Sequence, residues 1–133
     1  MPTRIMTVDD RADFRSMLTM MLDRQVDLEV VAEAGSLRDA RYHTARGAVD
    51  VVLLDLNLPD GKGWELIADL RSANPRIAVI VLSASFDGAN LARADEAGAD
   101  AILDKFAAPR EVVEAVRNAY VSRRRGRSSN GVG

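Results

Sequence analysis

The chain has 133 residues, of which 47% are hydrophobic and 29% are charged, as is typical of one soluble globular domain. It contains no cysteine, which excludes disulfide bonds and thiolate metal sites and suits a reducing cytoplasm. No apolar run approaches the length of a membrane span, and the N-terminus lacks a signal-peptide pattern. We therefore expect a cytoplasmic protein without membrane contact.

Charge is unevenly distributed along the sequence. The formal net charge is −2, yet residues 122–133 contain four arginines and no acid, a charge of +4 that leaves −6 for residues 1–121. An acidic body argues against nucleic-acid binding by the folded part. The last twelve residues are rich in arginine, glycine and serine, which predicts a flexible basic tail or linker over 122–133 behind a domain over 1–121.

Predicted strands and helices alternate five times. Short apolar runs predict the strands, and apolar residues at helical spacing predict the helices between them. The second helix is expected between an N-cap at Ser36 and a C-terminal Gly47. The predicted strands cover 4–8, 28–32, 51–54, 77–82 and 101–103, and the other helices cover 11–24, 64–73, 87–97 and a segment that starts at Pro109.

The predicted helices differ in the strength of their apolar faces. The first helix places Phe14, Met17, Leu18, Met21 and Leu22 on one face. This spacing predicts that its methionines belong to the core and the edge of the core. The fourth helix has only Leu91 and several alanines, which predicts a weakly anchored element.

Strict alternation of strands and helices implies an α/β fold with a parallel sheet and helices on both faces. Right-handed crossovers reduce the topologies to a few doubly wound orders. For five strands we expect the flavodoxin-like order 2-1-3-4-5. Its switch point lies between strands one and three, where this class of fold binds its ligands.

Polar side chains follow four of the predicted strands. Asp9 and Asp10 follow the first, Asp55 ends the third, and Ser83 and Lys105 follow the fourth and fifth. The carboxyl ends of parallel strands share one rim, so three acids, a hydroxyl and an ammonium are expected together. Crowded carboxylates repel one another unless a hard cation such as Mg²⁺ is present. A carboxylate beside such a cation can attack a phosphoryl group, and hydroxyl and ammonium donors would stabilise its oxygens.

At these positions the chain resembles the receiver domain of bacterial two-component response regulators. The matching segments are Asp9-Asp10, the run from Leu54 to Gly61, Ser83-Ala84, and Lys105 after Gly98-Ala99-Asp100. The resemblance implies a phosphorelay in which Asp55 accepts a phosphoryl group from a sensor histidine kinase. It also implies a Mg²⁺ site, whose ligands would be Asp9, Asp10, Asp55 and the backbone carbonyl of Asn57. Ser83 and Lys105 would be the switch pair, the two residues that bind the phosphate.

The sequence of residues 29–35 is similar to that of the NarL/FixJ-type subfamily, whose members carry a C-terminal DNA-binding domain. The resemblance therefore implies transcription control through an output domain absent from this chain, with DNA contacted only by that domain. It also implies a switch that catalyses only its own phosphorylation and dephosphorylation. We expect homodimerisation on phosphorylation, through the fourth and fifth helices with the fifth strand, or through the first and fifth helices.

The sequence departs from the receiver pattern near the switch pair. Phe106 follows Lys105 where the family has proline, so a trans peptide bond is expected there. Ile102 stands where many receivers carry a switching aromatic residue. Together with Ala84 and Ser85, which follow Ser83, Ile102 is a candidate modulator of the switch.

Two other classes of protein compete with this interpretation. A haloacid-dehalogenase-type phosphatase also uses a strand-end aspartate, Mg²⁺, a hydroxyl and a lysine. Its acid/base aspartate, however, lies two residues after the nucleophile, where this chain has Asn57. The other class is a receiver fold used only for binding, without phosphorylation.

A truncated NarL/FixJ-type regulator is favoured over a stand-alone receiver.

Overall fold

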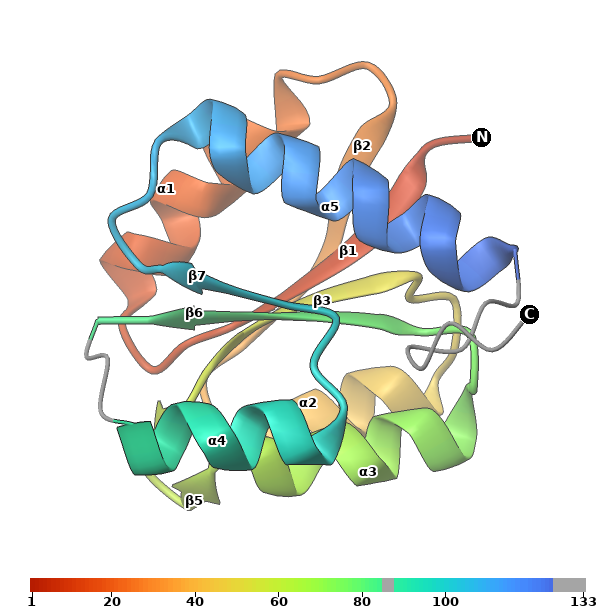
Figure 1. Ribbon diagram of the computed structural model, residues 1–133. Helices are drawn as coiled ribbons and strands as arrows, with labels where there is room; N and C mark the ends of the chain where they lie inside the picture. Colours follow the sequence, from red (N-terminus) through yellow and green to blue (C-terminus); the bar gives the residue numbers. More distant parts are fainter. Residues whose placement is uncertain (85–87, 126–133) are drawn as a thin grey trace.

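The computed structural model describes residues 1–84 and 88–125. Its main sheet has five parallel strands in the order β2-β1-β3-β6-β7, which confirms the predicted doubly wound fold (Figure 1). The strands are β1 (Thr3–Val8), β2 (Leu28–Ala34), β3 (Val51–Asp55), β6 (Ala78–Ser83) and β7 (Ala101–Asp104). The helices are α1 (Ala12–Asp23), α2 (Leu37–Ala45), α3 (Gly63–Ala73), α4 (Gly88–Ala97) and α5 (Pro109–Arg124).

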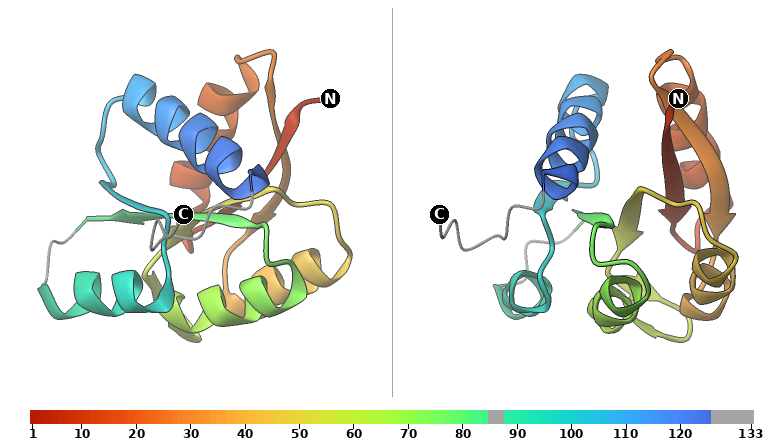
Figure 2. Two further views of the ribbon diagram at one scale, coloured as in Figure 1. Left: turned by 45° about the vertical axis from the view of Figure 1, so that its right-hand side comes forward. Right: turned by 90° about the vertical axis from the view of Figure 1, so that its right-hand side faces the viewer.

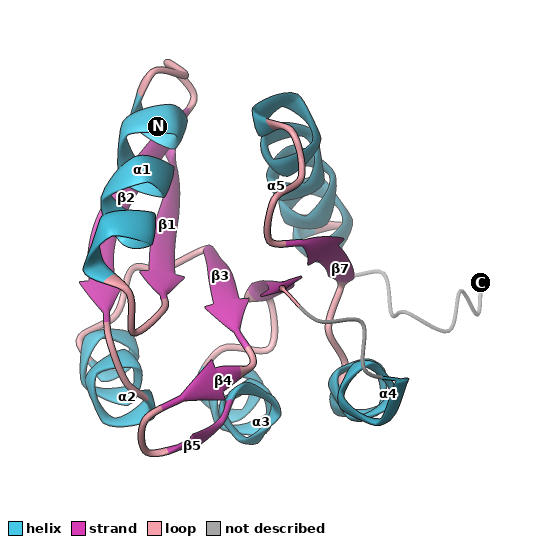
Figure 3. Ribbon diagram, turned by 90° about the vertical axis from the view of Figure 1, so that its left-hand side faces the viewer, coloured by secondary structure: helices cyan, strands magenta, loops and turns pink. Residues whose placement is uncertain are grey.

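The helices form two layers. Figures 2 and 3 show α1 and α5 on one face of the sheet and α2, α3 and α4 on the other. Side chains alternate between the faces along each central strand, as the period of two requires. In β3, for example, Val51 and Leu53 pack toward α1 and α5, whereas Val52 and Leu54 pack toward the other three helices. Burial on both faces explains why the central strands are continuous apolar runs.

A short antiparallel hairpin was not predicted. It pairs β4 (Asn57–Leu58) with β5 (Gly61–Lys62) directly after β3 (Figure 3). Strands of two residues show no periodicity in the sequence, so only the Pro59-Asp60 turn between them marks the place. The carboxylate of Asp60 accepts hydrogen bonds from the amides of Leu37 and Arg38 at 2.8 and 3.0 Å, and thereby holds the hairpin against the start of α2.

The α1 methionines were predicted to belong to the core and its edge. Met21 is half-buried against the core, whereas Met17 and Met20 are 51% and 63% exposed. Helix α1 packs on β1 and β2 through Leu18 and Leu22, whereas α5 packs on β3, β6 and β7. The two helices leave a groove of about 680 Å³ between them, which the methionines line together with Phe106. Phe106 itself is 79% exposed.

The C-terminal helix continues into the segment predicted as a tail. Helix α5 ends at Arg124, so Arg123 and Arg124 form its last turn. The exposed fraction of the Arg123 side chain is only 16%. Residues 126–133, which make up most of the predicted tail, lie outside the described residues.

Within the described residues, the structure has no helix both long and apolar enough to cross a membrane.

Candidate phosphoacceptor and metal site

The strand register places the acids at the same height of the sheet. Val8 of β1 pairs with Leu54 of β3, so the residues that follow them, Asp9 and Asp55, are level with each other. The β6–β7 register pairs Ser83 with Asp104, which places Lys105 one residue further along the same rim. The predicted grouping of these side chains is therefore present in the structure.

The three acids form one cluster. A carboxylate oxygen from each of Asp9, Asp10 and Asp55 lies within 4.8 Å of the others. Asp9 is 2% and Asp55 is 8% exposed, whereas Asp10 is exposed to solvent. The site therefore combines two buried carboxylates with one that is open to solvent.

Lys105 holds the buried acids together. Its Nζ lies 2.6 Å from Asp9 Oδ2 and 3.5 Å from Asp55 Oδ2, and only 10% of its side chain is exposed. The ammonium also lies 4.6 Å from the centre of the Phe14 ring, which is within range of a cation–π interaction. Lys105 thus places a positive charge between the two buried carboxylates, which reduces their mutual repulsion.

Burial and charge shift two pKa values in the site. Burial raises the pKa of Asp55, and the charge of Asp9 adds to this, while Lys105 and the amide of Asn57 oppose it. For Lys105, burial lowers the pKa, but the hydrogen bond to Asp9 and the charges of both acids outweigh it and raise the pKa overall. The ionised form of Asp55 is therefore less favourable than that of a surface aspartate, whereas the protonated form of Lys105 is more favourable than that of a surface lysine.

Backbone contacts fix Asp55 and its neighbours. Asp55 Oδ1 accepts the amide of Asn57 at 3.3 Å, and Asp9 Oδ1 accepts the amide of Arg11 at 2.8 Å. A Cβ atom added to Gly63 would lie 2.5 Å from the carbonyl oxygen of Asp55. Only glycine therefore allows α3 to start this close to the end of β3.

The remaining predicted residues lie around this cluster. Ser83 is 4% exposed at the end of β6, and its carbonyl accepts the amide of Lys105 at 2.9 Å. Asn57 has an exposed side chain that accepts a hydrogen bond from Lys62 at 3.0 Å, and its backbone carbonyl remains a predicted ligand. Ala84 is exposed and Ile102 is half-buried in β7. Ser85 lies outside the described residues, and the Lys105–Phe106 peptide bond is trans, as expected.

Sequence reasoning did not identify Arg15 as part of the site. Its guanidinium donates to the carbonyl oxygen of Asp9 and lies 3.3 Å from Glu33 of β2. Thr19 also donates to Glu33, at 2.9 Å. An arginine in the first turn of a helix gives no local signal of such contacts, because its partners lie on a different strand and loop.

The donor set fits Mg²⁺. All candidate ligands are oxygens, the carboxylates converge, and the exposed side leaves room for water molecules. Asp9, Asp10 and Asp55 would hold the ion. The charge of the ion would then compete with Lys105 for the two buried acids, or displace Lys105 from its position between them.

The raised pKa of Asp55 predicts a pH-dependent stability. The folded-state pKa lies above the usual value of 3.8, so ionisation of Asp55 destabilises the fold as pH rises through the folded-state pKa. In metal-free buffer, the free energy of unfolding of wild type should therefore increase relative to that of Asp55→Asn as pH falls from about 7 toward 4. Urea unfolding in the presence of a chelator measures this difference. A difference that stays constant over this range would contradict the burial explanation.

The comparisons with known proteins agree with this geometry. A sequence model of the family described as "Response regulator receiver domain" matches residues 5–117. The chain is 32% identical over 120 residues to the response regulator UvrY of Escherichia coli K12, a match that covers 90% of this chain and 55% of that protein. The DNA-binding transcriptional activator DevR/DosR of Mycobacterium tuberculosis gives the same identity and coverage. The chain thus spans slightly more than half the length of these curated relatives.

A solved structure supports the same assignment. The signal receiver domain of the putative response regulator NarL from Mycobacterium tuberculosis superposes with a TM-score of 0.84 and 28% sequence identity. The match covers 90% of this chain and 97% of that one. The predicted similarity to NarL/FixJ-type regulators is therefore confirmed.

Proposed function

Since the chain belongs to the response regulator receiver domain family, we propose that Asp55 accepts a phosphoryl group from the histidine of a sensor kinase in a Mg²⁺-dependent reaction. The observation that carries this proposal is the meeting of three carboxylates and one ammonium at a single rim of the sheet. Two of these acids are buried and tied to Lys105. Such a set is unfavourable for stability alone but suited to phosphoryl transfer.

In the proposed reaction, a carboxylate oxygen of Asp55 forms a bond to phosphorus. The bond between phosphorus and the donor nitrogen breaks, and its electron pair stays on the imidazole. Bound Mg²⁺ would supply charge that neutralises the phosphoryl oxygens and the carboxylates. Lys105 and the Ser83 hydroxyl provide further donors to these oxygens. In this proposal the domain catalyses only its own phosphorylation and the later hydrolysis.

The output is proposed to lie in a separate domain. Residues 1–121 carry a charge of −6, which disfavours contact with DNA. The relative DevR/DosR, by contrast, is described as DNA-binding and is considerably longer than this chain. We propose that phosphorylation promotes a homodimer and that DNA is contacted only by a domain fused to the receiver.

The proposal is tested with a small phosphodonor. Acetyl phosphate with Mg²⁺ should add one phosphoryl group to the intact protein by mass spectrometry, and a chelator should prevent this. Continuous turnover of a generic phosphate ester would instead indicate a phosphatase. Absence of any phosphorylated species, with a donor that labels a known receiver in parallel, would overturn the proposal.

Replacing Ser83 with Ala should separate phosphorylation from its structural consequence. The aspartyl phosphate still forms, but the β6–α4 connection loses a donor that draws it toward the phosphate. Helix α4 has a single fully buried residue, Ala94, and is the element we expect to respond most. Amide exchange in Gly88–Ala97 should change with beryllofluoride in wild type and in Ser83→Thr, and at most half as much in Ser83→Ala. Equal responses in all three proteins would exclude a role for the hydroxyl.

A further inference from the structure

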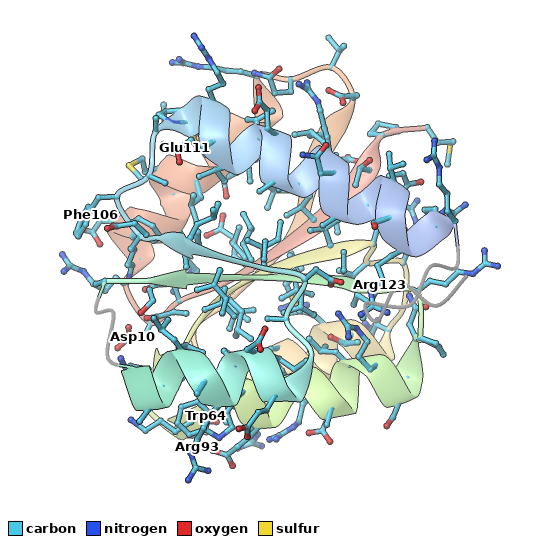
Figure 4. The ribbon with its side chains drawn as sticks, in the orientation of Figure 1. Asp10, Trp64, Arg93, Phe106, Glu111 and Arg123 are labelled. Atoms are coloured by element: carbon cyan, nitrogen blue, oxygen red, sulfur yellow. The ribbon has the colours of Figure 1, made fainter. Side chains whose placement is uncertain are left out.

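Three charged side chains meet at the end of the molecule opposite the acids. Asp100 precedes β7, Arg71 lies in the last turn of α3, and Arg123 lies in the last turn of α5. Asp100 Oδ2 lies 2.5 Å from an Arg71 nitrogen, and Asp100 Oδ1 accepts Arg123 Nε at 2.8 Å. Figure 4 shows Arg123 far from Asp10 and Phe106, which mark the phosphoacceptor end.

This cluster is built into the fold and is not a solvent-exposed ion pair. The side chains of Arg71, Asp100 and Arg123 are 17%, 13% and 16% exposed. Asp100 also accepts the amide of Val79 at 2.7 Å, and Arg71 Nε donates to the carbonyl of Ile77 at 3.0 Å. One carboxylate therefore separates two guanidinium groups and fixes both to the start of β6. Charge-assisted bonds in such surroundings are stronger than surface ion pairs.

Arg123 is the last anchor of α5 among the described residues. Beyond Ala119, the helix has only Tyr120 and Arg123 partly buried, and Val121, Ser122, Arg124 and Arg125 are exposed. Arg124 instead lies against the Tyr120 ring, 5.5 Å from its centre. The bond between Arg123 and Asp100 therefore fixes the last turn of α5 to the domain.

Strand β7 connects this cluster to the phosphoacceptor site. Asp100 directly precedes Ala101, and Lys105 directly follows Asp104. At about 3.3 Å per residue, Asp100 and Lys105 are about 16 Å apart along one extended segment. In the main sheet, β7 is an edge strand that pairs only with β6, so it can shift without breaking a second ladder.

We propose that the Arg71–Asp100–Arg123 cluster is a coupling latch, through which a displacement of β7 caused at Lys105 reaches the last turn of α5. This inference rests on the proposed function, since phosphorylation of Asp55 provides the displacement. The latch makes the position of the last turn of α5 depend on the state of a site at the other end of the sheet. A domain attached there would be repositioned without contacting the phosphate.

The test compares Arg123→Gln with Arg124→Gln. Both variants remove one positive charge from the same helical turn, but only Arg123 contacts Asp100. Amide exchange of the full chain is measured with and without beryllofluoride and Mg²⁺. Arg123→Gln should raise exchange in residues 120–125 about tenfold without ligand, because a hydrogen bond between charged groups is lost.

In wild type and Arg124→Gln, beryllofluoride should change exchange both in α4 and β7 and in residues 120–125. In Arg123→Gln, α4 and β7 should still respond, whereas residues 120–125 should not. The latch would be overturned if beryllofluoride changed amide exchange of residues 120–125 in Arg123→Gln as much as in wild type. It would also be overturned if, in wild type, exchange changed in β7 but not in residues 120–125. If beryllofluoride alters no segment of wild type, the proposed function itself fails, and the latch fails with it.

Discussion

Replacing Asp55 with Asn is expected to reduce phosphorylation by acetyl phosphate to background. The amide is nearly the same size as the carboxylate but is not a nucleophile toward phosphorus at neutral pH. Asp9 and Asp10 remain in this variant, so the experiment asks whether the position of Asp55 in the cluster is unique. Mass spectrometry of the intact protein, followed by borohydride trapping and peptide mapping, measures both the amount and the place of the modification.

The matched control for this variant is Asp13→Asn. Asp13 lies in the first turn of α1, close in sequence to Asp10, but its side chain is 76% exposed and pairs with Arg11 outside the acid cluster. This control should be phosphorylated to the wild-type level. Equal modification of Asp55→Asn and wild type would show that another group accepts the phosphoryl group.

The position of the acids was predictable because it follows from strand boundaries. A central parallel strand is an unbroken apolar run, so a carboxylate directly after it must lie at the rim. Val51-Val52-Leu53-Leu54 is of this kind, and the run before Asp9 is apolar except for the buried Thr7. The structure confirms the register of both strands. Ser36 and Gly47 likewise marked α2 correctly, since Ser36 accepts the amide of Asp39 at 3.0 Å and Gly47 has φ of +86°.

Other features could not be predicted, because they depend on contacts between distant segments. Arg71 and Asp100 are 29 residues apart, and Asp100 and Arg123 are 23 apart, with no local pattern linking them. The exposure of Met17 has a related cause. Helical spacing identifies which residues share a face, but the width of the gap between α1 and α5 decides whether that face is covered.

The geometry also distinguishes the receiver function from the phosphatase alternative. A phosphatase of that class needs an acid/base carboxylate two residues after the nucleophile. In this chain the position is Asn57, whose amide cannot exchange a proton with a leaving group. Its side-chain oxygen is occupied by Lys62 at 3.0 Å. Repeated turnover of a phosphate ester is therefore not expected from this site.

Asp10→Asn is expected to weaken Mg²⁺ binding about 30-fold. Two unit charges 4 Å apart attract by about 1 kcal/mol in water, so one carboxylate beside a divalent ion contributes about 2 kcal/mol. The aqueous value applies because Asp10 is the exposed member of the cluster. Titration with MgCl₂ at constant ionic strength, followed through the amide resonances of residues 9–11 and 55–57, gives the dissociation constant.

Asp13→Asn again serves as the control, because it removes the same charge from the neighbouring turn but not from the cluster of acids. Its effect should stay within about twofold, since exposed charges at longer range are screened by salt. Equal weakening by both substitutions would mean that Mg²⁺ responds only to the general acidity of this end of the sheet. Equal affinity of Asp10→Asn and wild type would remove Asp10 from the metal site and leave the two buried carboxylates, already neutralised in part by Lys105, as the only acidic ligands.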